Sequence, residues 1–359
     1  MKRVFKGIFK TLGILIALVL VAAAAFVGYL TVTEYNPADV ETVKVSYRAA
    51  EAAAFSGDSF RVLSWNIGYG ALGEESDFFM DGGSEVRPES EDIITKNMDG
   101  IRATVEDLAP DFCLLQEVDT GSDRSYDRQE ADFLTELTLC RASAYAYNYK
   151  CSFVPFPWPP IGKVGSGLLT MSGYEIDEAS HISLPCPFSW PMRVANLKRC
   201  LLVSRVPIEG TDRQLVLVNL HLEAYDDGEG KIAQTKQLLQ FLAEEYEKGN
   251  YVVAGGDWNQ VFPETLGRYP NEHPDLWTPG VLSEQDLNAG WLLVWDETTP
   301  TCRLLNQPYD PTDSENTQYY VIDGFLISPN LEPVSVQTLD QDFACSDHNP
   351  VLAELRITQ

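Results

Sequence analysis

The pattern of apolar and polar positions separates one long apolar run near the N-terminus from a series of strands and helices after residue 60. The run from Thr11 to about Val32 contains no charged residue. At roughly 22 residues it is long enough to cross a hydrocarbon layer of about 30 Å as a helix. We therefore predict an N-terminal transmembrane helix.

The charges that flank this run predict its orientation. Basic residues precede the run and acidic residues follow it, namely Lys2, Arg3, Lys6 and Lys10 before it and Glu34, Asp39 and Glu41 after it. The positive-inside rule then predicts a single-pass protein of the cell membrane, with its N-terminus in the cytoplasm and its main domain extracytoplasmic. The alternative is a cleaved signal peptide, with residues 22–25 (four alanines) near the cleavage site and a secreted domain.

The rest of the chain divides into a stalk and one domain. Residues 1–33 are the basic tail and anchor, residues 34–59 are mixed and polar and are expected to form a stalk, and residues 60–359 show no linker. Within the domain, short apolar runs predict strands at 60–65, 112–116, 166–171, 200–205, 214–219, 251–254 and 321–327. Helical spacing predicts helices at 93–108, around 134–137 and at 231–246. Many strands with a few helices on one core indicate an α/β sandwich.

Composition narrows the classes of partner. The chain carries a formal net charge of −27, with 53 acidic and 26 basic residues. Such a surface repels the phosphates of nucleic acids and lacks the basic patch that supplies most nonspecific binding to them. Seven cysteines suit an exported domain; Cys113 lies in an apolar run and is expected to be a free thiol, and the other six could form up to three disulfides.

Six short polar motifs occur at or near the ends of the predicted strands. In chain order they are Trp65-Asn66, Gln116-Glu117, Asn219-Leu220-His221-Leu222, Gly256-Asp257-Trp258-Asn259, Ile322-Asp323-Gly324 and Ser346-Asp347-His348. The last motif is expected to follow a strand that ends before Ser346. Carboxylates, an amide and an imidazole at strand ends can bind a hard divalent cation beside a general base.

Each motif alone also has an ordinary structural explanation, because a strand can end on a glycine, an asparagine or a glutamate without any function. Asp323 is harder to explain in this way, since it interrupts an apolar run and an unpaired buried carboxylate is costly. Two of the four histidines, His221 and His348, lie within the motifs. Together the six motifs predict one metal-dependent site.

In their order and spacing the motifs resemble the endonuclease/exonuclease/phosphatase superfamily, which includes deoxyribonuclease I, exonuclease III-type enzymes and neutral sphingomyelinases. The resemblance covers about residues 60 to 355. It implies a four-layer αββα sandwich, in which two packed and mainly antiparallel sheets are flanked by helices. It also implies that the site lies at one end of the sandwich.

The resemblance implies a metal site and a catalytic group. The metal ligands would be Glu117, with Asn66 and Asp347 beside it, and the ion would be Mg²⁺, with Mn²⁺ as the alternative. The catalytic residues would be Asp257 and Asn259, which position the water and the phosphate, His221, which donates to a phosphate oxygen, and His348 oriented by Asp323. His348 would act as the general base or as a phosphate-stabilising cation, and the proton acceptor is either His348 or Asp257.

One position departs from the pattern of the repair-type members. They often carry an acidic residue two positions after the asparagine, whereas Asn66 is followed by Ile67 and Gly68. This makes a nuclease of the repair type a weaker prediction. The sequence therefore predicts a membrane-anchored, Mg²⁺-dependent hydrolase of phosphate esters, acting on a phosphodiester or phosphomonoester of a lipid head group or small molecule. The alternatives are an extracellular nuclease and a catalytically silent binding module that retains the fold.

Overall fold

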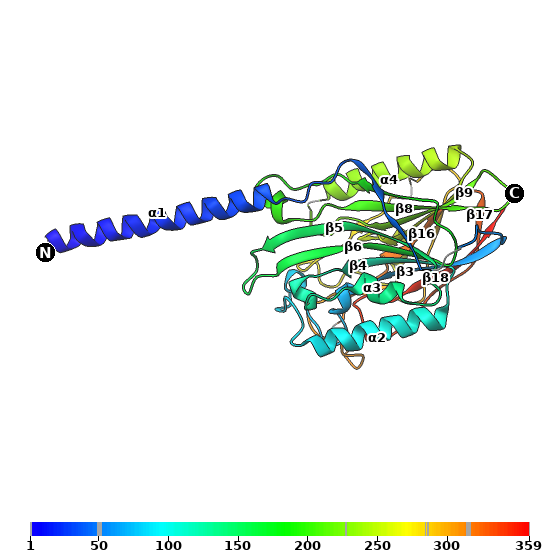
Figure 1. Cartoon of the computed structure of the whole chain (residues 1–359). Helices are drawn as coiled ribbons and strands as arrows, with labels where there is room; N and C mark the ends of the chain where they lie inside the picture. The colour runs from blue at the N-terminus through cyan, green and yellow to red at the C-terminus, as the bar shows by residue number, and fades with distance from the viewer. Residues whose placement is uncertain are drawn as a thin grey trace.

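Two seven-stranded sheets pack face to face in the computed structural model, which describes residues 2–48, 52–226, 228–283, 285, 287–313 and 317–358. Helices cover the outer face of each sheet, so the layers run helix, sheet, sheet, helix (Figure 1). The predicted four-layer αββα sandwich is confirmed.

The strands of each sheet come from distant parts of the chain. In spatial order the first sheet contains β1 (Val40–Val43), β7 (Glu178–Ser183), β8 (Cys200–Pro207), β9 (Gln214–His221), β10 (Tyr251–Asp257), β16 (Asp323–Ile327) and β13 (Leu292–Val294). The second sheet contains β17 (Leu331–Thr338), β18 (Val351–Ile357), β3 (Ser59–Asn66), β4 (Phe112–Asp119), β6 (Gly162–Ser172), β5 (Ala142–Val154) and β2 (Val45–Tyr47). Neighbours are antiparallel except for β9 with β10 and β3 with β4, which are parallel.

Shorter elements lie in the loops. Two small sheets pair β11 (Gln260–Val261) with β12 (Gly280–Val281) and β14 (Cys302–Arg303) with β15 (Tyr319–Tyr320). The 3-10 turns are η1 (Gly68–Gly70), η2 (Phe79–Asp81), η3 (Asp123–Ser125), η4 (Met192–Ala195) and η5 (Pro263–Thr265).

The alternation of apolar residues along the strands decides which layer each side chain enters. In β3, Val62 points between the sheets, whereas Leu63 and Trp65 point outward. The outward side chains are covered by α2 (Glu91–Leu108) and α3 (Glu130–Thr135). On the other face, α4 (Glu229–Glu247) packs Leu238 and Leu242 against the first sheet. Burial of these apolar faces is the main stabilising contribution to the sandwich.

The N-terminal run forms a single long helix, α1 (Lys2–Val32), that extends away from the sandwich (Figure 1). Its segment Phe5–Val32 is long and apolar enough to cross a membrane. Only the C-terminal end of α1 contacts the domain. Leu30 is 4% exposed and packs in a cluster with Val154 and Val194, and the ring of Phe26 lies 5.9 Å from that of Phe153.

The segment expected to be a stalk, residues 34–59, contributes a strand to each sheet. β1 pairs with β7 at the edge of the first sheet, and β2 pairs with β5 at the edge of the second. Only Lys44 separates β1 from β2. Part of the expected stalk therefore belongs to the sheets.

The cysteines differ from the expectation of up to three disulfides. All seven are free thiols, including Cys113, for which this was predicted. Five are buried, and they are divided among four separate apolar clusters: Cys113 with Cys140, then Cys151, Cys200 and Cys302. They act as small apolar side chains in the core.

Candidate active site

Four of the predicted residues meet because of how the strands pair. β9 and β10 are parallel, and their last residues, His221 and Asp257, are direct neighbours. β16 runs antiparallel to β10, so its first residue, Asp323, lies opposite Asp257. β3 ends at Asn66, whose amide nitrogen Nδ2 lies 3.0 Å from Oδ2 of Asp257 across the space between the two sheets.

Glu117 reaches the same end of the sandwich through a β-bulge. The expected strand exit after Gln116 was wrong, because β4 continues to Asp119. The pairing of β4 with β6 shifts register between Leu115 and Val118, and Glu117 has a φ of 54°. A bulge re-aims one side chain without ending the strand. Here it brings Oε1 of Glu117 to 3.4 Å from Nδ2 of Asn66 and leaves the side chain 24% exposed.

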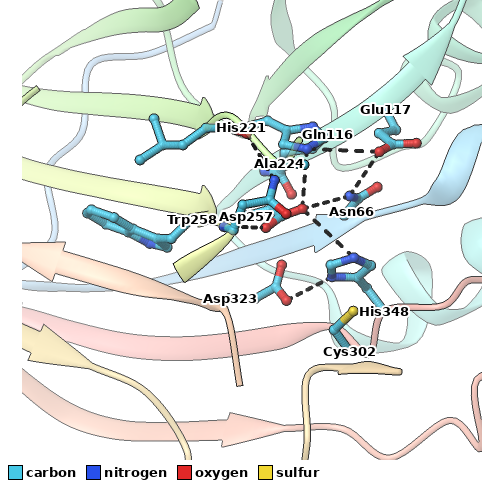
Figure 2. A network of polar contacts seen from close by, with 12 residues as sticks. Asn66, Gln116, Glu117, His221, Ala224, Asp257, Trp258, Cys302, Asp323 and His348 are labelled. Carbon is cyan, nitrogen blue, oxygen red and sulfur yellow. Dashed lines mark hydrogen bonds and ion pairs between the residues drawn. The ribbon is translucent and has the colours of Figure 1, made fainter. Parts of the chain in front are cut away.

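Asp257 is at the centre of the polar network (Figure 2). Its Oδ1 accepts a hydrogen bond from the backbone N–H of Asn259 at 2.8 Å, and its Oδ2 lies 3.3 Å from Nε2 of His221 and 3.8 Å from Nε2 of His348. The side chain is 2% exposed. Burial raises the pKa of Asp257 to about 7, although the nearby positive charge of His348 lowers it. A carboxyl with this pKa can exchange a proton near neutral pH.

His348 is held by a carboxylate, as the resemblance implies. Its Nδ1 lies 2.8 Å from Oδ2 of Asp323, and both side chains are buried. Burial lowers the pKa of His348, but Asp323, Cys302 and Asp347 raise it more, so the pKa lies well above its usual value. The ring therefore carries a positive charge at neutral pH, and its Nε2 is directed towards Asp257.

The loop that carries His348 is not preceded by a strand, contrary to our expectation. β17 ends at Thr338, and β18 begins at Val351, directly after the motif. Hydrogen bonds rather than a strand place the loop: Ser346 Oγ donates to the backbone oxygen of Asn66 at 2.8 Å, and Trp65 Nε1 donates to that of His348 at 2.8 Å. The motif is thereby fixed to the end of β3.

His221 and Asn259 complete the set of predicted catalytic residues. Burial lowers the pKa of His221 well below its usual value, and the positive charge of Arg199 lowers it further. A neutral imidazole with Nε2–H facing Asp257 can donate a hydrogen bond. Asn259 lies beside Asp257, where its Nδ2 donates to the backbone oxygen of Leu222 at 2.9 Å. That bond orients the amide, while the backbone N–H of Asn259 holds Asp257.

The residues predicted to hold a metal also gather at this end. Asp347 lies beside His348, with its Oδ2 3.9 Å from Nε2. Burial raises the pKa of Asp347 to about 7, His348 lowers it, and the negative charge of Glu117 raises it again. Buried carboxylates that repel each other are stabilised by a cation between them, and oxygen donors are the ligands that hard divalent ions prefer. Glu117 and Asp347 therefore fit a divalent metal.

Asn66 has a more complex position than that of a simple ligand. Its Oδ1 accepts a hydrogen bond from the backbone N–H of Gly68 at 3.1 Å, and its Nδ2 lies between Glu117 and Asp257. The amide thus links the residue predicted to bind the metal with the residue at the centre of the network. Its role as a metal ligand stays a prediction.

Two polar contacts near the site are formed by residues to which the sequence analysis assigned no role. Gln116 Nε2 donates to Oδ1 of Asn219 at 2.9 Å, and Asn219 Nδ2 donates to two backbone oxygens of the second sheet, so the pair links the sheets just behind the site. Both residues belong to the six motifs, so their position in those motifs could have indicated a role at the site.

The second contact lies on the loop between β3 and α2. The hydroxyl of Tyr225 donates to Oδ1 of Asp81 at 3.1 Å. Burial raises the pKa of Asp81 to about 6, the hydrogen bond from Tyr225 lowers it, and the charge of Glu117 raises it. The carboxyl of Asp81 therefore lies close enough to Glu117 for that charge to affect its pKa. No sequence pattern marked this residue, which follows an irregular acidic loop.

Arg124, in η3 just after β4, is a buried structural residue. It forms two hydrogen bonds to Asp119, at 2.9 and 3.0 Å, and lies 3.6 Å from the ring centroid of Tyr69. Its guanidinium is thereby occupied by the carboxylate and the ring.

The comparisons with known proteins agree with this geometry. Residues 63–348 match the model of the Endonuclease/Exonuclease/phosphatase family. Among solved structures, an endonuclease/exonuclease/phosphatase from Beutenbergia cavernae DSM 12333 is 17% identical, with 84% of this chain and 72% of that chain covered and a TM-score of 0.53. A truncated TDP2 from Caenorhabditis elegans is 19% identical, with coverage of 84% and 99% and a TM-score of 0.51.

ANGEL2, a 2′,3′-cyclic phosphatase, is 13% identical, with coverage of 88% of this chain and 99% of that chain and a TM-score of 0.53. At these identities the solved structures show the fold, and the family match shows the relationship. A search of curated proteins found no match. Because the family match covers most of the chain and spans all six motifs, the chain belongs to the Endonuclease/Exonuclease/phosphatase family, whose members hydrolyse phosphate esters.

Proposed function

We propose that this protein is a membrane-anchored, Mg²⁺-dependent phosphoesterase that hydrolyses a phosphodiester or phosphomonoester of a lipid head group or small molecule outside the cytoplasm. The observation that supports it best is the convergence on Asp257 of Asn66, His221 and His348, with Glu117 alongside. These groups come from five separate segments. They supply a metal-binding carboxylate, a proton acceptor and a positive charge in one place.

The metal would be held by Glu117 and Asp347, with Asn66 beside them. A bound divalent ion supplies charge neutralisation for the phosphate and polarises water. The chain's own residues then have separate tasks. Asp257 suits the role of proton acceptor, because its pKa of about 7 lets it be ionised for a large fraction of molecules at neutral pH.

His348 suits a different task. Because its pKa lies well above the usual value, the imidazole favours its protonated form and is poorly suited to take a proton from water. Its positive charge faces the region where a phosphate would place its oxygens, and Asp323 keeps the ring oriented. His221, with its lowered pKa, stays neutral and donates a hydrogen bond. Of the two proton acceptors left open by the sequence, we therefore favour Asp257.

The class of substrate follows from charge and anchoring. A net charge of −27 disfavours a long polyanion such as DNA or RNA. α1 is apolar and exposed over most of the segment that could span a membrane, and it would hold the domain at the bilayer surface. A phosphate ester in a lipid head group, or one on a small molecule, fits both conditions.

The test is a panel assay of the full chain in lipid nanodiscs, with Mg²⁺, Mn²⁺ or EDTA. The substrates are bis-p-nitrophenyl phosphate, p-nitrophenyl phosphate, sphingomyelin, phosphoinositides and DNA. We expect turnover that requires the metal and is higher for a small or lipid ester than for DNA. Preferred turnover of DNA, with an affinity that falls steeply with salt, would instead identify a nuclease.

A pair of variants separates an enzyme from a binding module. Glu117→Gln removes one charge at the predicted metal site and should abolish metal-dependent turnover. Glu247→Gln is the matched control, because Glu247 is exposed at the end of α4, next to the start of β10 and not to its end at Asp257. Equal turnover in both variants, or none with any ion in the unsubstituted chain, would contradict the proposal.

A further inference from the structure

Two loops at one end of the sandwich carry exposed apolar side chains. One joins β5 to β6, and the other joins β7 to η4 and continues into its first residue. Their exposed fractions are 69% for Phe156, 90% for Trp158, 58% for Trp190 and 67% for Met192. We call these four residues the aromatic rim. Aromatic side chains bury large areas when they are covered, so such a group on an open surface indicates a contact with an apolar partner.

The hairpin of β5 and β6 ends on the side of the sandwich from which α1 extends (Figure 1). The indole N–H of Trp190 donates to Oγ1 of Thr31 in α1 at 3.1 Å. Next to it, Arg193 forms two hydrogen bonds to Glu34, at 2.9 and 3.2 Å. Just before the other loop, Phe153 in β5 packs edge-on against Phe26 of α1. The two loops are thus placed by direct contacts with the helix.

These contacts also give the height of the rim relative to a bilayer. Lys10 is the last charged residue before the apolar run. The 20 residues from position 11 to position 30 span about 30 Å as a helix, which is the thickness of the hydrocarbon layer. Thr31 then lies at the outer boundary of that layer, and Trp190, bonded to it, lies at the level of the head groups, where tryptophan is enriched in membrane proteins.

The loop after β5 lies deeper. Phe26 is five residues before Thr31, or about 7 Å further into the layer along the helix axis. Since Phe153 at the end of β5 packs on Phe26, the loop between β5 and β6 starts at this depth. The exposed side chains of Phe156 and Trp158 in that loop would then meet lipid.

We propose that the aromatic rim is a membrane-docking surface that inserts into the outer leaflet of the bilayer and fixes the orientation of the domain. It rests on the anchoring in the proposed function, and not on the phosphoesterase activity.

The rim is also connected to the active-site end. The ring of Phe156 lies 5.9 Å from that of Phe79, which belongs to the same 3-10 turn as Asp81. Asp81 in turn binds Tyr225 and is close enough to sense the charge of Glu117. Insertion of the rim would therefore hold the active-site end of the sandwich near the head groups.

The experiment uses tryptophan fluorescence of the full chain in phosphatidylcholine vesicles, with and without lipids brominated near the head group. α1 contains no tryptophan, so the anchor itself does not contribute to the signal. Trp158→Phe and Trp190→Phe each remove one emitter and keep an apolar ring. Trp295→Phe is the matched control, since Trp295 is part-buried between β13 and β14. Flotation after a carbonate wash confirms that each variant is inserted.

We expect brominated lipid to lower the emission assigned to Trp158 and Trp190 by about two-fold or more, as for side chains in the interface, and to leave that of Trp295 nearly unchanged. Equal emission with and without bromine for chains that float with the vesicles would overturn the proposal. A blue-shifted emission without quenching would also overturn it, because protein would then cover the rim. A chain that does not float would refute the anchoring on which the proposal rests, whatever its activity.

Discussion

The pair formed by His348 and Asp323 is best tested by Asp323→Asn. The substitution keeps the size and a hydrogen-bonding oxygen next to Nδ1 of the imidazole but removes the negative charge 2.8 Å away. Both side chains are buried, so solvent screens their interaction only weakly. The variant removes the charge that raises the pKa of the imidazole, and it also removes a charge that raises the pKa of Asp257, so the two limbs of a pH profile must be followed separately.

The expected size of the effect follows from the charge pair. Two unit charges about 4 Å apart near a protein surface interact with about 4 kcal/mol, which corresponds to about 3 pKa units. Asp347 continues to raise the pKa of His348 in the variant, so we expect a fall of about 2 units. An imidazole that is partly neutral and free to rotate should lower kcat by about 10²- to 10⁴-fold, the usual contribution of such a group.

The assay is kcat against pH for a nitrophenyl phosphate ester at saturating Mg²⁺. A raised folded-state pKa keeps His348 protonated to higher pH, so activity that needs the imidazolium falls as pH rises through that pKa. In Asp323→Asn this descending limb should move to lower pH. The control is Asp107→Asn, an exposed aspartate near the C-terminal end of α2, whose profile should match the parent.

Two outcomes would refute the reasoning. One is a variant whose descending limb and kcat both match those of Asp107→Asn, because the charge of Asp323 would then have no influence. The other is a descending limb that moves to higher pH in Asp323→Asn, because the carboxylate would then not be what raises the pKa of His348.

Three further predictions concern metal binding, stability and backbone fit. Mg²⁺ at 100 times its dissociation constant should stabilise the folded chain by about 2.7 kcal/mol in a thermal melt, and Glu117→Gln should lose this gain; a gain of equal size in the variant would exclude the site. Although burial raises the pKa of Glu245, the hydrogen bonds of Arg205 and its neighbours lower it to about 2. Since a depressed pKa stabilises the fold above its unfolded value, Glu245→Gln should cost about 2–3 kcal/mol at pH 7 in a urea titration, with the difference shrinking as pH falls from about 4.5 towards 2; a difference independent of pH would contradict this. Gly256→Ala should lower the stability of the fold by about 2–4 kcal/mol and should also lower kcat. The reason is that φ of Gly256 is 153° and a Cβ would overlap the carbonyl oxygen of Leu220. An unchanged melting temperature would show that the strand can move to make room for the Cβ.

Much of the site could be predicted because several of its residues are the last residues of strands. The apolar runs before Asn66, His221 and Asp257 are recognisable strands, and the ends of parallel strands meet at one edge. Asp323 was marked by its position inside an apolar run, where an ionisable group needs a partner, and that partner is His348.

Other features depend on contacts that no local pattern records. The bulge at Glu117 arises from the pairing of β4 with β6, so the residues around it read as a simple strand exit. The loop of Ser346 is placed by hydrogen bonds to β3, which lies about 280 residues earlier. The partnership of Asp81 with Tyr225 joins two irregular loops and has no periodicity to reveal it.

The passage of the chain from β1 to β2 has a practical consequence for the whole protein. Within eight residues the backbone pairs first with the outer edge of β7, in the first sheet, and then with the outer edge of β5, in the second sheet. A shortened protein that begins after Tyr47 would leave two open sheet borders side by side, both ready to recruit strands from other molecules. Such a truncation, chosen to make the domain easier to handle in water, would instead favour aggregation. A soluble form should begin before Val40, so that only the apolar part of α1 is removed.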